Sequence, residues 1–287
     1  MQTIELRTPA KINLVLDVLH RRDDGYHEIR SLIIKIGLYD RMAVGPGPEG
    51  CVEIACSDPS IPTDHRNLVH QAATRLSRHI GRHPGCTVRL DKGIPASAGL
   101  GGGSGNAAGA LRALNTLWSA ACSPQVLSEL AADIGSDVPL FLGGAGAIVT
   151  GRGERVEPAR LQWDGWIALV MGGVPVSTVE TYRQCTPRSP ERLHENLSEL
   201  VVADHAAGLR AGMRNDLEQA VFAVEPRMRA LFERVCEIAG RPARISGAGA
   251  VLFDLFDTEA DARAYGERLR AGGIAHEIRI VRGPVAD

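Results

Sequence analysis

Aromatic residues are scarce in this chain, and it carries almost no excess charge of either sign. Phe, Trp and Tyr make up 4% of the 287 residues, and the formal net charge is −2. No basic field is therefore available to hold a long nucleic acid, and few rings are available to stack on single-stranded bases. These shortages argue against a nucleic acid as partner.

Long apolar runs and paired cysteines are also missing. The longest apolar runs, such as residues 167–171, are far shorter than the roughly 20 residues that span a bilayer. Residues 1–5 lack the pattern of a signal peptide. The six cysteines contain no C-x-x-C pair, which argues against a zinc cage or a redox dithiol. We therefore expect reduced, mostly buried thiols in a cytoplasmic protein that does not associate with a membrane.

Lysine is rare although arginine is abundant. Of the 32 basic residues only Lys11, Lys35 and Lys92 are lysines. A lysine offers a compact ammonium that arginine cannot imitate, and Lys11 and Lys92 fall inside the motifs described below. The count alone is equally consistent with chance.

Hydrophobic residues make up 44% of the chain and charged residues 23%, as in globular proteins with a true core. Periodicity and turn signals predict the following elements: strands at 12–20, 31–36, 52–55, 86–90, 166–170, 244–245, 251–256 and 277–281, helices at 67–80, 104–121, 124–134, 226–239 and 260–271, and a turn at 45–50. Because helices and strands mix without strict alternation, we expect an α+β fold. A polar stretch at 157–164 predicts two domains, residues 1–160 and 161–287.

The strongest signal is a glycine-rich segment ahead of the helix predicted at 104–121. Five glycines occur within seven residues, at positions 99, 101, 102, 103 and 105. Glycine lets a ligand approach the backbone closely, and a helix start offers free N–H donors. The segment is neither a Walker A loop nor a strict G-x-G-x-x-G fingerprint. It predicts a phosphate site, and a flexible loop without a ligand is the weaker alternative.

Residues 95–104 fit P-x-x-x-G-L-G-[GS]-[GS]-[SAG], and this pattern resembles the phosphate loop of the GHMP kinases. Further segments resemble one branch of that family: 9–16, 22–27 with Ser31, 65–68, 134–141, 215–217 and 245–253. The resemblance spans nearly the whole chain in the expected order. Gly105 and Ala248 depart from it, since hydroxyl residues are usual at both positions.

The resemblance implies a two-domain α+β fold. The N-terminal domain would hold the glycine-rich loop leading into a helix, and a smaller ferredoxin-like domain would follow it. The implied activity is ATP- and Mg²⁺-dependent phosphorylation of the 2-hydroxyl of a methylerythritol that carries a cytidine diphosphate group, in the non-mevalonate pathway to isoprenoids. Another small alcohol, or a non-catalytic nucleotide sensor, are the alternatives. A monomer or weak homodimer is expected.

Two residues are the candidate catalytic pair. A carboxylate at Asp137 would take the proton of the accepting hydroxyl as general base, although Asp before Val-Pro also suits a helix N-cap. By the resemblance, Lys11 would lie beside Asp137 and keep it ionised. A surface lysine is the alternative for Lys11.

The remaining candidates bind the two substrates, and no metal ligand is assigned beyond a role for Ser104 at phosphate or metal. By the resemblance, Asn67 would contact adenine, although it also suits helix capping, and Tyr182 also suits core packing. The predicted ATP-binding residues are Pro95, Ala96, Ser97, Ala98, Gly99, Leu100, Gly101, Gly102, Gly103, Ser104, Gly105, Asn67 and Lys92. The predicted residues for the cytidine substrate are Asn13, Tyr26, His27, Thr178 and Tyr182.

Overall fold

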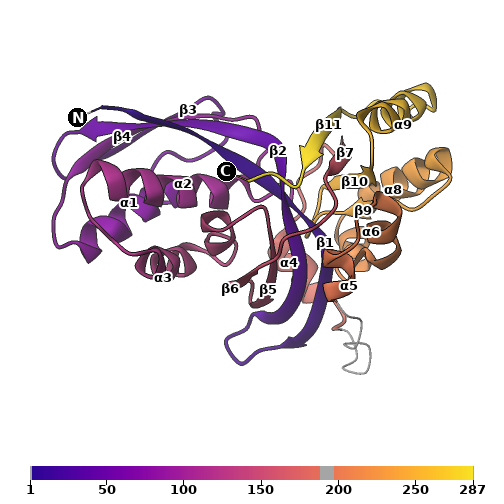
Figure 1. Cartoon of the computed structure of the whole chain (residues 1–287), viewed down its shortest axis with the longest axis horizontal. Coiled ribbons are helices and arrows are strands. Elements are labelled where there is room, and N and C mark those ends of the chain that lie inside the picture. Colours follow the sequence, from indigo (N-terminus) through magenta and orange to yellow (C-terminus); the bar gives the residue numbers. More distant parts are fainter. Residues whose placement is uncertain (1, 188–196, 287) are drawn as a thin grey trace.

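The computed structural model describes residues 2–187 and 197–286, which form two neighbouring β-sheets with helices packed on them. Two long antiparallel strands, β1 (Ile4–Arg21) and β2 (His27–Gly47), run from the N-terminal part into the middle of the molecule. There the C-terminal helices lie beside them (Figure 1). The two strands therefore connect the two parts of the structure.

The first sheet has the order β3-β4-β2-β1-β8, with β5 paired to β2 and β6 paired to β5. Its shorter strands are β3 (Val52–Cys56), β4 (Gly85–Asp91), β5 (Gly146–Gly151), β6 (Arg155–Pro158) and β8 (Arg214–Asn215). Strand β8 pairs in parallel with β1. A C-terminal segment thus contributes an edge strand to the N-terminal sheet.

Strand β1 is buried on both faces between residues 8 and 18. Its Ile12 and Leu14 share one hydrophobic core with the second sheet, whereas Leu16 lies in the other core, with the N-terminal helices. The polar residues of the strand, such as Asn13, are buried as well. Apolar residues alternate over 12–18, a pattern that predicts a half-buried strand. That expectation is wrong here, because alternation cannot show that a second layer covers the polar face.

Helices pack against one face of the first sheet (Figure 1). They are α1 (Leu68–His79), α2 (Gly102–Leu117), α3 (Pro124–Ile134) and the 3-10 helix η1 (Pro139–Leu142). Small residues let α2 lie close to β1: a Cβ atom on Gly109 would come within 2.7 Å of Cγ2 of Thr8. Helix α2 is consequently buried along most of its length.

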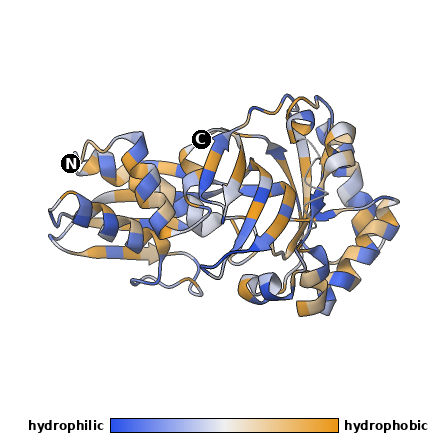
Figure 2. Cartoon of the chain, turned by 90° about the horizontal axis from the view of Figure 1, so that it is seen from below, coloured by the Kyte–Doolittle hydropathy of each residue, from blue (hydrophilic) through white to orange (hydrophobic). Residues whose placement is uncertain are grey.

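The second sheet is antiparallel, with the order β11-β7-β10-β9. Its strands are β7 (Gly165–Met171), β9 (Arg244–Ile245), β10 (Val251–Phe256) and β11 (Ile278–Gly283). The accompanying helices are α4 (Thr178–Gln184), α5 (Leu197–Val201), α6 (Ala206–Gly212), α7 (Glu218–Val224), α8 (Pro226–Ala239) and α9 (Glu259–Ala271). Apolar (orange) and polar (blue) residues occur on both the strands and the helices of the molecule (Figure 2). No helix within the described ranges is long and apolar enough to cross a bilayer.

The predicted α+β class is confirmed, and several element bounds agree with the structure. Helices α3 and α8 and strand β10 have the predicted limits. The predicted turn at 45–50 is partly wrong, because β2 continues to Gly47 in register with β4. The division at residue 160 falls between β6 and β7 and stays a prediction.

All six cysteines are free thiols, but they are not mostly buried as expected. Only Cys86 and Cys185 are buried, and Cys51 is exposed. Burial raises the pKa of Cys86 to about 11, which makes this thiol a poor nucleophile.

Candidate active site

The glycine-rich loop and the start of α2 form one wall of a cavity of about 320 Å³. Gly99 and Gly101 have φ values of 73° and 71°, in the left-handed region that favours glycine. Apart from Gly105, every predicted ATP-binding residue lines this cavity. Gly105 lies inside α2, where an added Cβ would be 3.4 Å from the ring of Phe141.

The first turn of α2 suits an anion. Gly101 is the N-cap residue, and it makes no side-chain capping bond to the free N–H groups at the start of this described helix. Such N–H groups, together with the positive end of the helix dipole, favour phosphate. Ser104 lies in the same turn and lines the cavity.

Lys92 lies next to the glycine-rich loop, where hydrogen bonds hold its ammonium in place. Its Nζ donates to Asp40, which is fully buried, and to Oδ1 of Asn106 at 3.1 Å. Asp40 also accepts from the backbone N–H of Gly93 at 2.9 Å. The ammonium lies 3.3 Å from where a Cβ on Gly102 would be. Lys92 is therefore tied to Asp40 and to Asn106 of α2 at the start of the loop. Its direct contact with the nucleotide stays a prediction.

Asn67 caps helix α1. Its Oδ1 accepts from the N–H of Val69 at 2.9 Å, and its Nδ2 donates to the carbonyl of Pro62 at 2.7 Å. The capping alternative is therefore observed. Asn67 also lines the cavity, and its adenine contact stays a prediction.

The structure brings Lys11 and Asp137 together. Nζ of Lys11 lies 3.8 Å from Oδ2 of Asp137, and the side chain of Lys11 is 6% exposed against 41% for Asp137. Burial lowers the pKa of Lys11, while the charge of Asp137 acts in the opposite direction. Asp137 does not cap η1, whose N-cap residue is Val138. A buried ammonium thus lies beside an accessible carboxylate.

Asn13 completes this pair. It lies two residues after Lys11 on β1 and hence on the same face of the strand. Its Oδ1 accepts from Nζ of Lys11 at 2.7 Å, and its Nδ2 donates to Oγ of Ser31 at 2.8 Å. Ser31 in turn donates to the carbonyl of Val15. Lys11 is therefore held at one end of a buried hydrogen-bonded chain.

Two of the predicted cytidine residues, His27 and Tyr182, form an aromatic stack. The rings of His27 and Tyr182 stack, with centroids 5.4 Å apart and planes at 29°. Burial, and secondly the charge of Asp137, raise the pKa of Tyr182. Burial also lowers the pKa of His27, which favours a neutral imidazole. Thr178 lies one turn before Tyr182 on α4, and so on the same helix face.

Tyr26 lies outside this stack and is 53% exposed. Cζ of Arg152 lies 5.2 Å from the centroid of its ring. Arg152 was missed from the sequence, although it stands between two glycines with positive φ, Gly151 and Gly153. A Cβ on Gly153 would be 3.7 Å from Oδ1 of Asp137. This tight turn thus brings a cation to the edge of the site.

The described part of the chain also has a larger depression, which none of the predicted site residues lines. A depression of about 1060 Å³ on the strands of the first sheet is lined by charged residues such as Arg7, Arg41 and Arg89. Neither Lys11 nor Asp137 lines it. The catalytic candidates thus belong to the smaller cavity and its surroundings.

The described residues contain no group of three or more His, Cys, Asp and Glu that could hold a metal ion by themselves. Mg²⁺ in phosphoryl-transfer sites typically uses one or two protein oxygens together with phosphates and waters. The Ser104 hydroxyl beside the loop and the accessible Asp137 carboxylate are oxygen donors of this kind. The donor set therefore fits a magnesium ion that arrives with a nucleotide.

Comparison with known proteins agrees with this geometry. The model of the GHMP kinases N terminal domain matches residues 67–145, and that of the GHMP kinases C terminal matches residues 193–275. A 4-diphosphocytidyl-2-C-methyl-D-erythritol kinase of Listeria monocytogenes is 34% identical over 280 residues, which are 97% of this chain and 96% of that protein. The enzyme of that name from Enterococcus faecalis is 35% identical over 285 residues, 98% and 99% of the two chains.

Solved structures show the same relationship. A crystal structure of 4-(cytidine 5'-diphospho)-2C-methyl-D-erythritol kinase has a TM-score of 0.78 at 32% identity, covering 97% of this chain and 98% of that chain. Homoserine kinase from Cytophaga hutchinsonii shares the fold, with a TM-score of 0.69 at 19% identity over 100% of this chain and 96% of the other. The chain therefore belongs to the GHMP kinases, and within them to the 4-diphosphocytidyl-2-C-methyl-D-erythritol kinases.

Proposed function

We propose that this chain transfers the γ-phosphoryl group of ATP to the 2-hydroxyl of 4-diphosphocytidyl-2-C-methyl-D-erythritol, in the non-mevalonate pathway. One observation carries the proposal: the Lys11–Asp137 ion pair lies beside the glycine-rich loop. The N–H of Lys11 donates to the carbonyl of Leu100 at 2.9 Å. The charge of Asp137 also acts on Tyr182, which stacks on His27.

The loop side would bind the phosphates of ATP. Phosphoryl transfer depends mainly on positioning and on neutralising charge. The N–H groups at the start of α2 supply donors for the phosphate oxygens, and Ser104 adds a hydroxyl. Ser104 would also offer its hydroxyl to Mg²⁺, which when bound would neutralise charge on the phosphates.

Asp137 would accept the proton of the 2-hydroxyl. Its carboxylate is the accessible member of the pair, so a substrate hydroxyl can reach it. The ammonium of Lys11 would favour the ionised carboxylate and stabilise an alkoxide forming next to it. Asn13 fixes the ammonium through its 2.7 Å hydrogen bond.

The aromatic side would recognise cytosine. A neutral His27 offers one donor and one acceptor, which suits the edge of a base. Tyr26 and Tyr182 would supply ring faces, and Thr178 would face the substrate from the same side of α4 as Tyr182. Arg152 would bring a positive charge to the diphosphate group.

Magnesium dependence, a cytoplasmic location and a monomeric or weakly dimeric state remain predictions. The proposal itself is tested by a coupled ATPase assay over small alcohols, with and without a cytidine diphosphate group. We expect turnover with 4-diphosphocytidyl-2-C-methyl-D-erythritol and little with 2-C-methyl-D-erythritol alone. Equal rates for alcohols without cytidine would instead support a GHMP kinase for another small alcohol.

A further inference from the structure

A short segment of the C-terminal half, residues 214–217, pairs with β1, the strand that carries Lys11, and hydrogen-bonds to a glycine-rich loop at residues 246–249. In this segment β8 pairs with β1, and the N–H of Asp216 donates to the carbonyl of Leu16 at 2.9 Å. The carboxylate of Asp216 accepts from the N–H of Val18 at 2.9 Å. The segment is therefore attached to the strand that carries Lys11.

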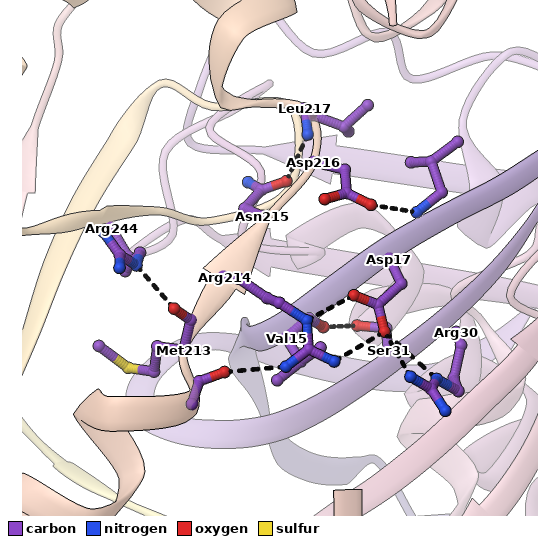
Figure 3. A network of polar contacts seen from close by, with 12 residues as sticks. Val15, Asp17, Arg30, Ser31, Met213, Arg214, Asn215, Asp216, Leu217 and Arg244 are labelled. Carbon is purple, nitrogen blue, oxygen red and sulfur yellow. Dashed lines mark hydrogen bonds and ion pairs between the residues drawn. The ribbon is translucent and has the colours of Figure 1, made fainter. Parts of the chain in front are cut away.

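A buried ion pair strengthens this attachment. Nε of Arg214 donates to Oδ1 of Asp17 at 2.6 Å, and Arg30 donates to Oδ2 of the same carboxylate at 2.9 Å (Figure 3). Asp17 is fully buried on β1. These contacts fix the segment on β1 but do not involve the 246–249 loop.

Asn215 makes the contacts to that loop. Its Nδ2 donates to the carbonyl of Ile245 at 2.9 Å and to that of Gly247 at 2.8 Å. Its Oδ1 accepts from the N–H of Leu217 at 2.9 Å, so its orientation is set (Figure 3). The side chain is buried. One carboxamide thus ties the last carbonyl of β9, that of Ile245, and the loop carbonyl of Gly247 to the segment that is fixed on β1.

The loop that Asn215 holds touches both halves of the active site. A Cβ on Gly247 would lie 3.4 Å from Nζ of Lys11 and from Oδ1 of Asn13. Oγ of Ser246 donates to the carbonyl of Gly99 at 3.1 Å. A Cβ on Gly99 would be only 2.3 Å from the carbonyl oxygen of Ser246. The loop therefore packs directly against the ammonium of Lys11 and against the phosphate loop.

We infer that Asn215 is a positioning residue of the kinase reaction: through the 246–249 loop it holds Lys11 and the phosphate loop in their working arrangement. The inference rests on the proposed function. Asn215 does not reach the reacting atoms itself. Because a small displacement of reacting groups can cost about 10²-fold in rate, loss of its two donated hydrogen bonds would reduce turnover.

The test compares two nearly isosteric substitutions in neighbouring residues. Asn215→Asp keeps the acceptor for Leu217 but places an oxygen against the carbonyls of Ile245 and Gly247, so the loop is pushed away. Asp216→Asn is the matched control, because an amide oxygen still accepts from Val18 and no bond to the loop changes. Asn215→Ala removes the donors without adding repulsion.

We expect Asn215→Asp to lower kcat about tenfold or more relative to Asp216→Asn and to raise KM for ATP. Melting temperatures of both variants show whether the effect follows general destabilisation. Asn215→Ala should change kcat in the same direction, and it decides the question if the carboxylate variant does not fold.

The inference is overturned if the Asn215 variants keep the kcat of Asp216→Asn, or if the loss is confined to KM for the cytidine substrate. A loss of kcat that merely parallels the melting temperature across all three variants would also overturn it. Wild-type turnover is measured first. Its absence would refute the proposed function, whereas an active wild type with unaffected Asn215 variants would refute only the role of Asn215.

Discussion

Replacement of Gly101 by alanine tests the phosphate loop. Gly101 has a φ of 71°, and an added Cβ would lie 2.8 Å from Cζ of Phe141 and 3.0 Å from Cγ of Lys11. The ring of Phe141 is buried, so it cannot move aside freely. Alanine at this position would therefore be strained by both the backbone conformation and the neighbouring side chains.

The size of the effect follows from these two causes. A left-handed conformation costs a non-glycine residue about 1–2 kcal/mol, and overpacking a core contact costs about 1 kcal/mol or more. The loop can relieve this strain by leaving the conformation that binds ATP. The apparent affinity for ATP then falls in proportion to the fraction of molecules that keep that conformation. About 2–3 kcal/mol corresponds to roughly a 30- to 150-fold rise in Kd.

Isothermal titration with a non-hydrolysable ATP analogue measures this change. Gly240→Ala is the matched control: its φ is 66°, and nothing lies within 4 Å of the added Cβ at the end of α8. The control should lose stability but keep nucleotide affinity. Unchanged affinity in a folded Gly101→Ala variant would refute the assignment of the loop to phosphate binding.

Further substitutions separate the roles of the other residues. Lys11→Arg should lower kcat at least about tenfold, because the wider guanidinium does not fit beside Asn13; retained turnover would show that the lysine is not specifically needed. Burial lowers the pKa of Lys11. The ammonium should therefore lose its proton at a pH below the usual lysine pKa near 10.5, and wild-type kcat should decline as the pH rises through that lower value. The arginine variant should lack that decline in a pH–rate profile. His27→Ala should raise KM for the cytidine substrate about 5- to 150-fold, from a loss of about 1–3 kcal/mol, and leave KM for ATP unchanged; equal changes would mean that His27 serves the fold. The pKa of His27 is lowered by burial, so that KM should stay constant on acidification until below the usual histidine pKa near 6.5.

The sequence allowed good predictions where local chemistry decides the structure. Helix α3 has its predicted limits because local signals mark both ends: Ser123 caps its first turn, Pro124 is its first residue and Gly135 follows its last. The glycine-rich loop could be predicted because five glycines within seven residues are typical of a loop that lets a ligand approach the backbone. Short elements such as α6, α7 and β8 were missed, since they are too short to show a period.

The arrangement of the site depends on contacts that local patterns do not contain. Lys11 and Asp137 lie far apart in the chain, and only the family resemblance predicted their proximity. Burial of both faces of β1 depends on a sheet formed later in the chain. For the same reason the contacts of Arg152 with Tyr26, and of Asn215 with the 246–249 loop, could not be predicted from spacing.

The most direct test of the proposed reaction is single-turnover phosphorylation of 4-diphosphocytidyl-2-C-methyl-D-erythritol by the wild type and by Asp137→Asn. Asparagine has nearly the same shape as aspartate but cannot accept the proton, and general-base catalysis contributes about 10²–10⁴-fold. With both substrates saturating, we expect a loss of that size in a folded variant that binds both ligands as the wild type does. A variant that retains more than about a third of the wild-type rate would contradict the assignment of Asp137 as the base.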